Sequence, residues 1–349
     1  MKNSEKAKAI FEKLENGHIN LWHDISKEEF YILFNEVDWD KLDDVSFDFE
    51  MLKLFSKFRD AHTRYFIKNK TLLNKLVYRD DKLYINENGK YLEVISINNC
   101  SVEELYDSFS KIVCYETKDW KNKQIEIGFN SKYFYEMIGI KDELVAKLYN
   151  DNFIELSVAS EEELKKRVST FKPYTYSVIN NILCLKYSAC RDDKDLPFID
   201  FVKEMKDKVE ELNIDKYILD LRGNAGGNSE ILNPFQDFVR EKKLNGVLLI
   251  DSGVFSSGRF AIAKFKKEFN TLLIGTPTGG AASSYGYNNN DSVDDKSFSY
   301  SIRYWDFKDV FNDSGSINPD IYVENSIEDL ENNYDRVLEY ALSYLKNKN

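Results

Sequence analysis

The chain has 349 residues, of which 42% are hydrophobic and 14% aromatic, and its formal net charge is -12. This length allows a large core and two domains, and this composition excludes a disordered chain. The acidic balance argues against nucleic acid or an anionic membrane surface as a partner, because either needs a basic footprint.

Cysteines and histidines show no metal-binding spacing, so no metal site is predicted. Thiols are expected at the four cysteines, with a disulfide as the less favoured alternative, at Cys100, Cys114, Cys184 and Cys190. No stretch has the length and apolarity of a membrane span, and residues 1–6 lack the apolar core of a signal peptide. The sequence as written predicts a cytoplasmic protein, or an exported one if a signal had been removed from its N-terminus.

Residues 1–63 are predicted to form a helical segment, because apolar residues recur there at helical spacing. The pattern ends at Asp60-Ala61-His62-Thr63. Residues 64–170 form a middle region rich in predicted strands, with strand-like runs at 65–67, 83–85 and 91–97. A helix is expected over 101–113, where Ser101 and Glu104 form a capping box. The pattern from 115 to 170 is mixed and predicts no clear order of elements.

From residue 171 to 349 strands and helices alternate, which predicts a mostly parallel sheet with covering helices. The expected strands are 181–187, 217–221, 247–250 and 272–275, and an amphipathic helix is expected over 198–212. The segment 276–286 is predicted to be a flexible loop.

Two serines, Ser256 and Ser257, lie at the turn between the strand ending at 250 and the helix that follows. A serine there exposes its hydroxyl and faces the first N–H groups of a helix, which suits a nucleophile. The alternative is that either serine only caps the helix.

The loop Asp220-Leu221-Arg222-Gly223-Asn224-Ala225-Gly226-Gly227-Asn228 follows another predicted strand. Its glycine spacing fits neither a Walker loop nor a dinucleotide fingerprint. It is either a tight turn or an oxyanion hole, in which backbone N–H groups face the serine turn at the same sheet edge. His62, at a helix-to-strand junction, is a candidate base, because a serine nucleophile needs a group that titrates near neutral pH. The alternative is that it is a solvated or core histidine.

Taken in order, five motifs resemble the C-terminal processing (tail-specific) and tricorn-type serine peptidases. The loop at 217–227 is similar to the strand and DLRxNxGG loop of that family. The other four motifs are the nucleophile turn at 255–258, a strand and loop at 274–280, a late Pro-Asp signature at 318–321 and an Asp-x-His-Thr at 60–63. The match extends from about residue 50 to the end and is weakest over 115–170.

The resemblance implies a role for each matching residue. Ser256 corresponds to the nucleophile and His62 to the base of the tricorn branch. The oxyanion hole corresponds to Gly226 or Gly227 with the N–H of Ser257. Asp313 falls near the family's acidic residue. The lysine that the other branch uses as base is replaced here by Ala281, and Arg259 stands where family members commonly carry Glu.

As a whole, the resemblance implies an α/β chain in which a Clp protease/crotonase-like catalytic domain follows the helical segment and the middle region. It implies a serine endopeptidase that hydrolyses peptide or protein substrates without metal or cofactor. A catalytically inactive binding module for an apolar ligand or peptide is the alternative. Tyr304 and Trp305 are candidate substrate-binding residues, with core packing as the alternative role.

Overall fold

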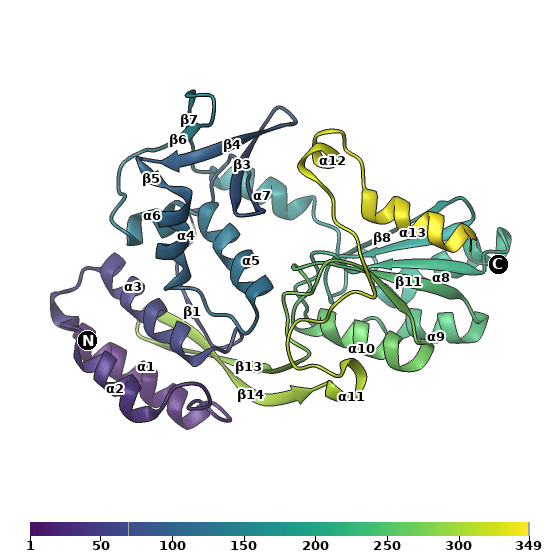
Figure 1. Ribbon diagram of the computed structural model, residues 1–349. Coiled ribbons are helices and arrows are strands. Elements are labelled where there is room, and N and C mark those ends of the chain that lie inside the picture. The colour runs from purple at the N-terminus through teal and green to yellow at the C-terminus, as the bar shows by residue number, and fades with distance from the viewer. Residues whose placement is uncertain (69, 348–349) are drawn as a thin grey trace. The chain divides into compact units, whose positions relative to one another are not determined.

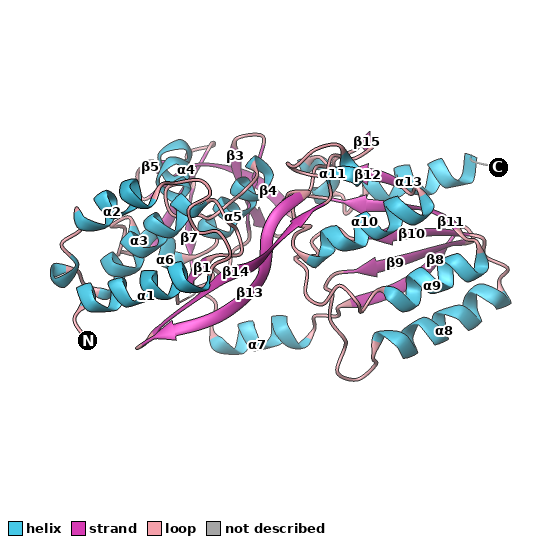
Figure 2. Cartoon of the chain, turned by 90° about the horizontal axis from the view of Figure 1, so that it is seen from below, coloured by secondary structure: helices cyan, strands magenta, loops and turns pink. Residues whose placement is uncertain are grey.

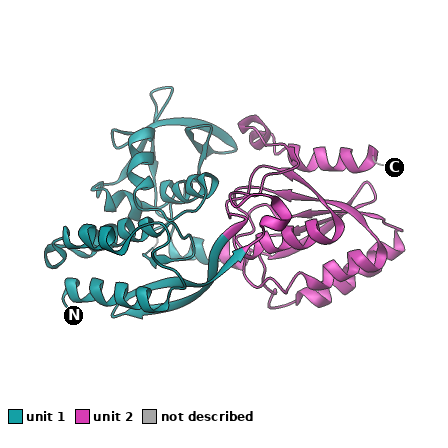
Figure 3. Cartoon of the chain, turned by 60° about the horizontal axis from the view of Figure 1, so that its bottom comes forward, with its two compact units in different colours: residues 1–165, 284–305 teal, residues 166–283, 306–349 magenta. Residues whose placement is uncertain are grey.

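The structure is a computed structural model that describes residues 1–68 and 70–347 (Figure 1). The chain divides into two compact units (Figure 3). The N-terminal unit contains residues 1–165 and 284–305, and the C-terminal unit contains residues 166–283 and those from 306 on. Among the described residues, no helix combines the length and apolarity needed to cross a bilayer.

The N-terminal unit begins with helices that pack around aromatic side chains such as Phe11, Phe30 and Phe55. Two of these helices follow Ser26 and Asp43, whose side chains accept backbone N–H groups of the first turn. The predicted helical segment is therefore confirmed. Its elements are α1 (Asn3–Gly17), α2 (Lys27–Asn35), η1 (Trp39–Lys41), α3 (Asp44–Phe55) and η2 (Ser56–Phe58).

The middle of this unit is an antiparallel sheet in the order β2-β3-β4-β6-β7, with helices packed against it. The capping box of Ser101 and Glu104 begins α4 as predicted. The stretch that the sequence left unassigned supplies α5, α6, β6 and β7. The bounds are β2 (Leu76–Arg79), β3 (Lys82–Glu87), β4 (Lys90–Ile97), β5 (Cys100–Ser101), α4 (Val102–Ser110), α5 (Lys118–Phe129), α6 (Lys132–Met137), β6 (Leu144–Leu148) and β7 (Phe153–Leu156).

A third sheet, in the order β1-β14-β13, completes this unit. Strand β1 (Arg64–Phe66) pairs antiparallel with β14 (Lys296–Asp306), so that Tyr65 lies opposite Phe298. The long hairpin of β13 (Ser283–Val293) and β14 is prominent in Figure 2. The loop predicted over 276–286 is thus wrong from Ser283 onward, where β13 begins.

The C-terminal unit is built on a sheet in the order β15-β12-β11-β10-β9-β8, parallel except for β8. Successive strand residues point to opposite faces, so Leu219 packs in one cluster with helix residues such as Phe238 and Phe265, while Ile218 packs in another with Leu342. The predicted strands and the helix over 198–212 are confirmed. The strands are β8 (Tyr174–Ile179), β9 (Ile182–Tyr187), β10 (Lys216–Asp220), β11 (Asn245–Ile250), β12 (Leu272–Gly275) and β15 (Ile321–Tyr322).

Helices on both faces of this sheet confirm the α/β class (Figure 1). The helices of this unit are α8 (Phe198–Glu211), α9 (Asn233–Lys242), α10 (Ser257–Phe269), α11 (Lys308–Phe311), α12 (Ile327–Glu331) and α13 (Arg336–Asn347), and α7 (Glu161–Ser169) joins the two units. The division into 1–63, 64–170 and 171–349 stays a prediction. The compact units add a feature that it did not contain, because residues 284–305 return to the N-terminal unit.

Candidate active site

Ser256 occupies a strained turn between β11 and α10. Its φ is 47° and its ψ is -123°, a backbone conformation that residues other than glycine rarely adopt. Although Ser256 is the N-cap residue, its side chain makes no capping hydrogen bond. The capping alternative is therefore wrong for Ser256. A serine held in this way at a strand-to-helix turn has the geometry of a nucleophile elbow.

The hydroxyls of the two adjacent serines differ in their partners. Ser257 Oγ donates a hydrogen bond of 2.6 Å to the carbonyl of Gly227. The half-buried Ser256 hydroxyl makes no hydrogen bond to any described residue. Of the two serines, Ser256 has the hydroxyl available to attack a substrate.

The glycine-rich loop after β10 is fastened to the serine turn by Asn224, which is fully buried. The Asn224 amide donates to the carbonyl of Tyr187 at 2.8 Å, and its side-chain oxygen accepts from the N–H of Gly226 at 2.9 Å. The backbone carbonyl of Asn224 accepts from the N–H of Phe255 at 3.0 Å. Asn224 therefore holds the glycine-rich loop with its side chain and the serine turn with its backbone, at the same edge of the sheet.

Gly226 and Gly227 have positive φ values of 105° and 134°, which favour glycine. A Cβ on Gly226 would lie 2.7 Å from the Ser256 Cβ and 2.8 Å from the Ser257 nitrogen. Because the Gly226 N–H already bonds to Asn224, it has no hydrogen left for an oxyanion. The N–H groups of Gly227 and Ser257 form no hydrogen bond within the described chain, so these two remain as the predicted oxyanion donors.

Arg259 lies beneath the serine turn and is 1% exposed. Its Nε donates to the carbonyl of Ser256 at 3.2 Å, and its Nη1 donates to the carbonyl of Ala281. A Cβ on Gly280 would lie 2.4 Å from the Arg259 Cδ, so the glycine makes room for the arginine stem. Arg259 thus ties the serine turn to the loop that contains Ala281.

Replacing Arg259 with Met is expected to lower the free energy of unfolding by about 2 to 3 kcal/mol, since two buried carbonyls lose a charged donor. Urea unfolding of the full chain measures this loss. Arg240→Met is the matched control, because Arg240 is 52% exposed and ion pairs at the surface contribute little to stability. Equal losses in the two variants would contradict the role given to Arg259.

His62 lies in the N-terminal unit, in the turn before β1, and is 7% exposed. The Ser299 hydroxyl donates to its backbone carbonyl at 2.8 Å. The neighbouring Thr63 Oγ1 accepts from the N–H of Ser301 at 3.2 Å. Strand β14 therefore fixes the backbone on which the imidazole is carried.

Asp60, which is fully buried, supports the same turn. Its Oδ1 accepts from the backbone N–H of His62 at 2.8 Å, and its Oδ2 accepts from the Thr63 hydroxyl at 2.6 Å and contacts His18 Nε2 at 2.9 Å. Because His18 Nδ1 accepts from the N–H of Asn20, His18 carries its proton on Nε2 and donates to Asp60. Burial alone would raise the pKa of Asp60, but hydrogen bonds from His18 and Thr63 and the charge of His62 hold that pKa well below its usual value.

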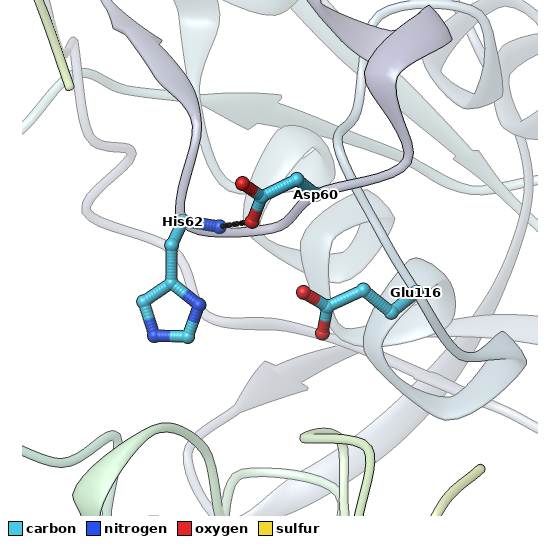
Figure 4. A group of neighbouring side chains, drawn as sticks. All are labelled: Asp60, His62 and Glu116. Carbon is cyan, nitrogen blue, oxygen red and sulfur yellow. Dashed lines mark hydrogen bonds between the residues drawn. The ribbon is translucent and has the colours of Figure 1, made fainter. Parts of the chain in front are cut away.

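A second carboxylate near His62, that of Glu116, was missed by the sequence analysis. Single side-chain atoms of Asp60, His62 and Glu116 lie within 4.8 Å of one another, and Figure 4 shows the Glu116 side chain extending toward the imidazole. Glu116 lies in the stretch whose pattern predicted nothing, so the sequence held no signal for it. These atom types also ligate divalent cations, but both Asp60 oxygens already accept hydrogen bonds, so the group carries no metal proposal.

The remaining candidates lie at the surface of their units. The Asp313 carboxylate accepts from the N–H groups of Ser314 at 2.6 Å and Gly315 at 3.0 Å, which lowers its pKa. Tyr304 is 46% exposed, which core packing does not explain, and it packs edge-on against Tyr285 with ring centroids 4.9 Å apart. Trp305 is half-buried. The roles of Asp313, Tyr304 and Trp305 stay predictions.

The four cysteines are confirmed as thiols. Burial raises the pKa of Cys114 to about 12 and that of Cys190 to about 11. Neither thiol therefore has the character of an activated nucleophile.

The chain resembles known proteins in its three-dimensional structure but not in its sequence. No family model matches the chain, and no curated protein sequence matches it. Among solved structures, mature CPAF complexed with lactacystin superposes with a TM-score of 0.70 at 10% identity, covering 98% of this chain and 97% of that one. A putative peptidase from Parabacteroides merdae gives 0.56 at 13% identity, covering 100% and 98%. The photosystem II D1 C-terminal processing protease gives 0.52 at 9% identity, covering 93% and 94%.

These superpositions cover almost the whole of each chain, so they are not limited to one unit. The fold of the C-terminal processing proteases, which the motifs led us to expect, is thereby confirmed. At 9 to 13% identity the likeness establishes the fold and nothing finer.

Proposed function

We propose that the protein is a serine endopeptidase of the C-terminal processing and tricorn type, and that its C-terminal unit is a Clp protease/crotonase-like catalytic domain. Ser256 is the nucleophile, His62 is the base, and the N–H groups of Gly227 and Ser257 form the oxyanion hole. Tyr304 and Trp305 bind substrate, which is a peptide or a protein. Asp313 is the acidic residue that the family pattern offers as the partner of His62.

The strained backbone of Ser256 carries this proposal. A φ of 47° at a serine costs on the order of 1–3 kcal/mol and persists only where the surroundings enforce it. Here Asn224 and Arg259 fix the turn from two sides. The result is a hydroxyl without a hydrogen bond to any described residue, next to N–H groups of Gly227 and Ser257 that are likewise unused. A binding module has no need of this combination.

In the proposed reaction, Ser256 Oγ attacks the carbonyl carbon of a peptide bond while its proton passes to the His62 imidazole. The carbonyl oxygen becomes an oxyanion, which the two N–H groups stabilise by roughly 3 kcal/mol each. Collapse of this intermediate breaks the C–N bond, and His62 gives its proton to the leaving amine. Water then releases the acyl group by the same steps.

Labelling with a serine-directed fluorophosphonate, followed by mass mapping of the adduct, tests this function. We expect one adduct, on the peptide that contains Ser256, because only an activated serine reacts quickly with this reagent. Labelling should fall as the pH drops below about 6, where an imidazole base becomes protonated. A chain that binds peptides but takes up no label at any pH would favour the inactive binding module.

A further inference from the structure

We propose that Glu116 positions the His62 imidazole for its role as base. This inference deepens the proposed function and rests on it. It assigns the acidic role to a residue of the same compact unit as His62, in place of Asp313 of the C-terminal unit.

The geometry within the N-terminal unit supports Glu116. Its carboxylate accepts a hydrogen bond of 3.2 Å from the N–H of Ala61, the residue that precedes His62. The same carboxylate approaches the imidazole to within 4.8 Å (Figure 4). Glu116 therefore bonds to the backbone of the His62 turn and extends its carboxylate toward the ring.

Asp60 is the other carboxylate near the ring, but its oxygens are already used. Oδ1 accepts from the backbone N–H of His62, and Oδ2 accepts from Thr63 and His18. The Asp60 carboxylate thus binds the backbone N–H of His62, whereas the Glu116 carboxylate extends toward the His62 side chain. In this proposal, Asp60 holds the backbone of His62 and Glu116 positions its imidazole.

The chemistry of a serine peptidase gives such a carboxylate a defined task. When it holds one ring N–H, the other ring nitrogen is left as the acceptor that takes the serine proton. It also stabilises the imidazolium that forms, which raises the pH at which the ring is half protonated. A carboxylate in the same unit keeps this tautomer without a contribution from the C-terminal unit.

Several charged and titratable groups of the N-terminal unit lie around the ring. Asp60 and Glu116 lie nearest, and His18 reaches the site through Asp60. Arg64 interacts electrostatically with Cys114, Glu116 and Asp60, and its Nε donates to the carbonyl of Ala61. Burial raises the pKa of the Cys114 thiol, which keeps it neutral. In the neutral pH range, the negative charge close to the ring is therefore that of the two carboxylates.

NMR titration of the His62 ring tests the inference in the full-length Ser256→Ala protein with isotope-labelled histidine. Loss of the His62 signal in His62→Gln assigns it. We expect Glu116→Gln to lower the pH of half protonation by about one unit, the size of effect that a neighbouring carboxylate has. Glu103→Gln, the same change on an exposed position of α4, should leave that pH unmoved.

Peptide hydrolysis, measured in the protein that keeps Ser256, supplies the second readout. Glu116→Gln should lower kcat about 100-fold or more at unchanged KM and shift the acidic limb of the pH profile downward, and Glu116→Asp should recover part of kcat. A titration that Asp313→Asn shifts and Glu116→Gln does not would overturn the inference and return the role to Asp313. Because the titration needs no catalysis, an inactive protein would refute the proposed function while still deciding the role of Glu116.

Discussion

Replacement of Ser256 by Ala is expected to abolish fluorophosphonate labelling and to lower peptide hydrolysis on the order of 10⁵-fold, since the covalent step is lost. Ser257→Ala keeps the backbone N–H of residue 257 and loses only the hydroxyl bond to Gly227. We expect it to retain more than about a tenth of the activity, since one neutral hydrogen bond contributes roughly 1 kcal/mol. Hydrolysis and labelling of the two purified variants are compared at equal concentration.

A third variant separates the turn from the chemistry. Ser256→Gly loses the hydroxyl as Ser256→Ala does, but glycine adopts a φ of 47° without strain. The free energy of unfolding, measured in urea, should therefore be about 1 kcal/mol higher for Ser256→Gly than for Ser256→Ala, although both variants are inactive. An active Ser256→Ala together with an inactive Ser257→Ala would reverse the assignment of the nucleophile.

Loss of the imidazole is expected to have the second largest effect. His62→Ala should reduce kcat about 100-fold or more, the usual contribution of a positioned base. In the unmodified protein, activity should fall as the pH drops through about 6 to 7, because only the neutral imidazole accepts the serine proton. Hydrolysis rates measured between pH 5 and 10 give both results.

His23→Ala is the control for the loss of any histidine, because the His23 ring packs at a tilt against Tyr285 and has no place in the proposed chemistry. It should leave the pH profile unchanged. A profile that rises only above about pH 9 would instead indicate a lysine base and count against His62.

Sequence patterns predicted the C-terminal unit well because its strands and helices are set by residues close together in the chain. Strands such as β10 and β11 are buried on both faces and read as continuous apolar runs, and each is bounded by glycine or acidic residues. The turn at Ser256 follows from the same pattern, since a strand and a helix leave only a few residues between them.

The surroundings of His62 could not be predicted, because they depend on contacts between distant residues. Glu116 lies 55 residues from Ala61, to which it bonds, and Asp60 lies 42 residues from His18. The hairpin of β13 and β14 was missed for a local reason. Its first strand carries the run Asn288-Asn289-Asn290-Asp291, whose residues disfavour strands and typically mark loops.

The return of residues 284–305 to the N-terminal unit has a consequence for synthesis on the ribosome. A nascent chain that has emerged only as far as residue 165 lacks β14, and so lacks Phe298 opposite Tyr65 and the Ser299 hydroxyl on the His62 carbonyl. All of β8 to β12, including the Ser256 turn, is translated before that strand. At about 5–20 residues per second, residues 166–306 take roughly 7 to 28 seconds to make, and the His62 turn lacks β14 for that time. Strand β15 and helix α13 of the C-terminal unit are translated later still, so the C-terminal unit is incomplete when β14 is made, and the proposed peptidase is latent at least until residues 321–347 have been made.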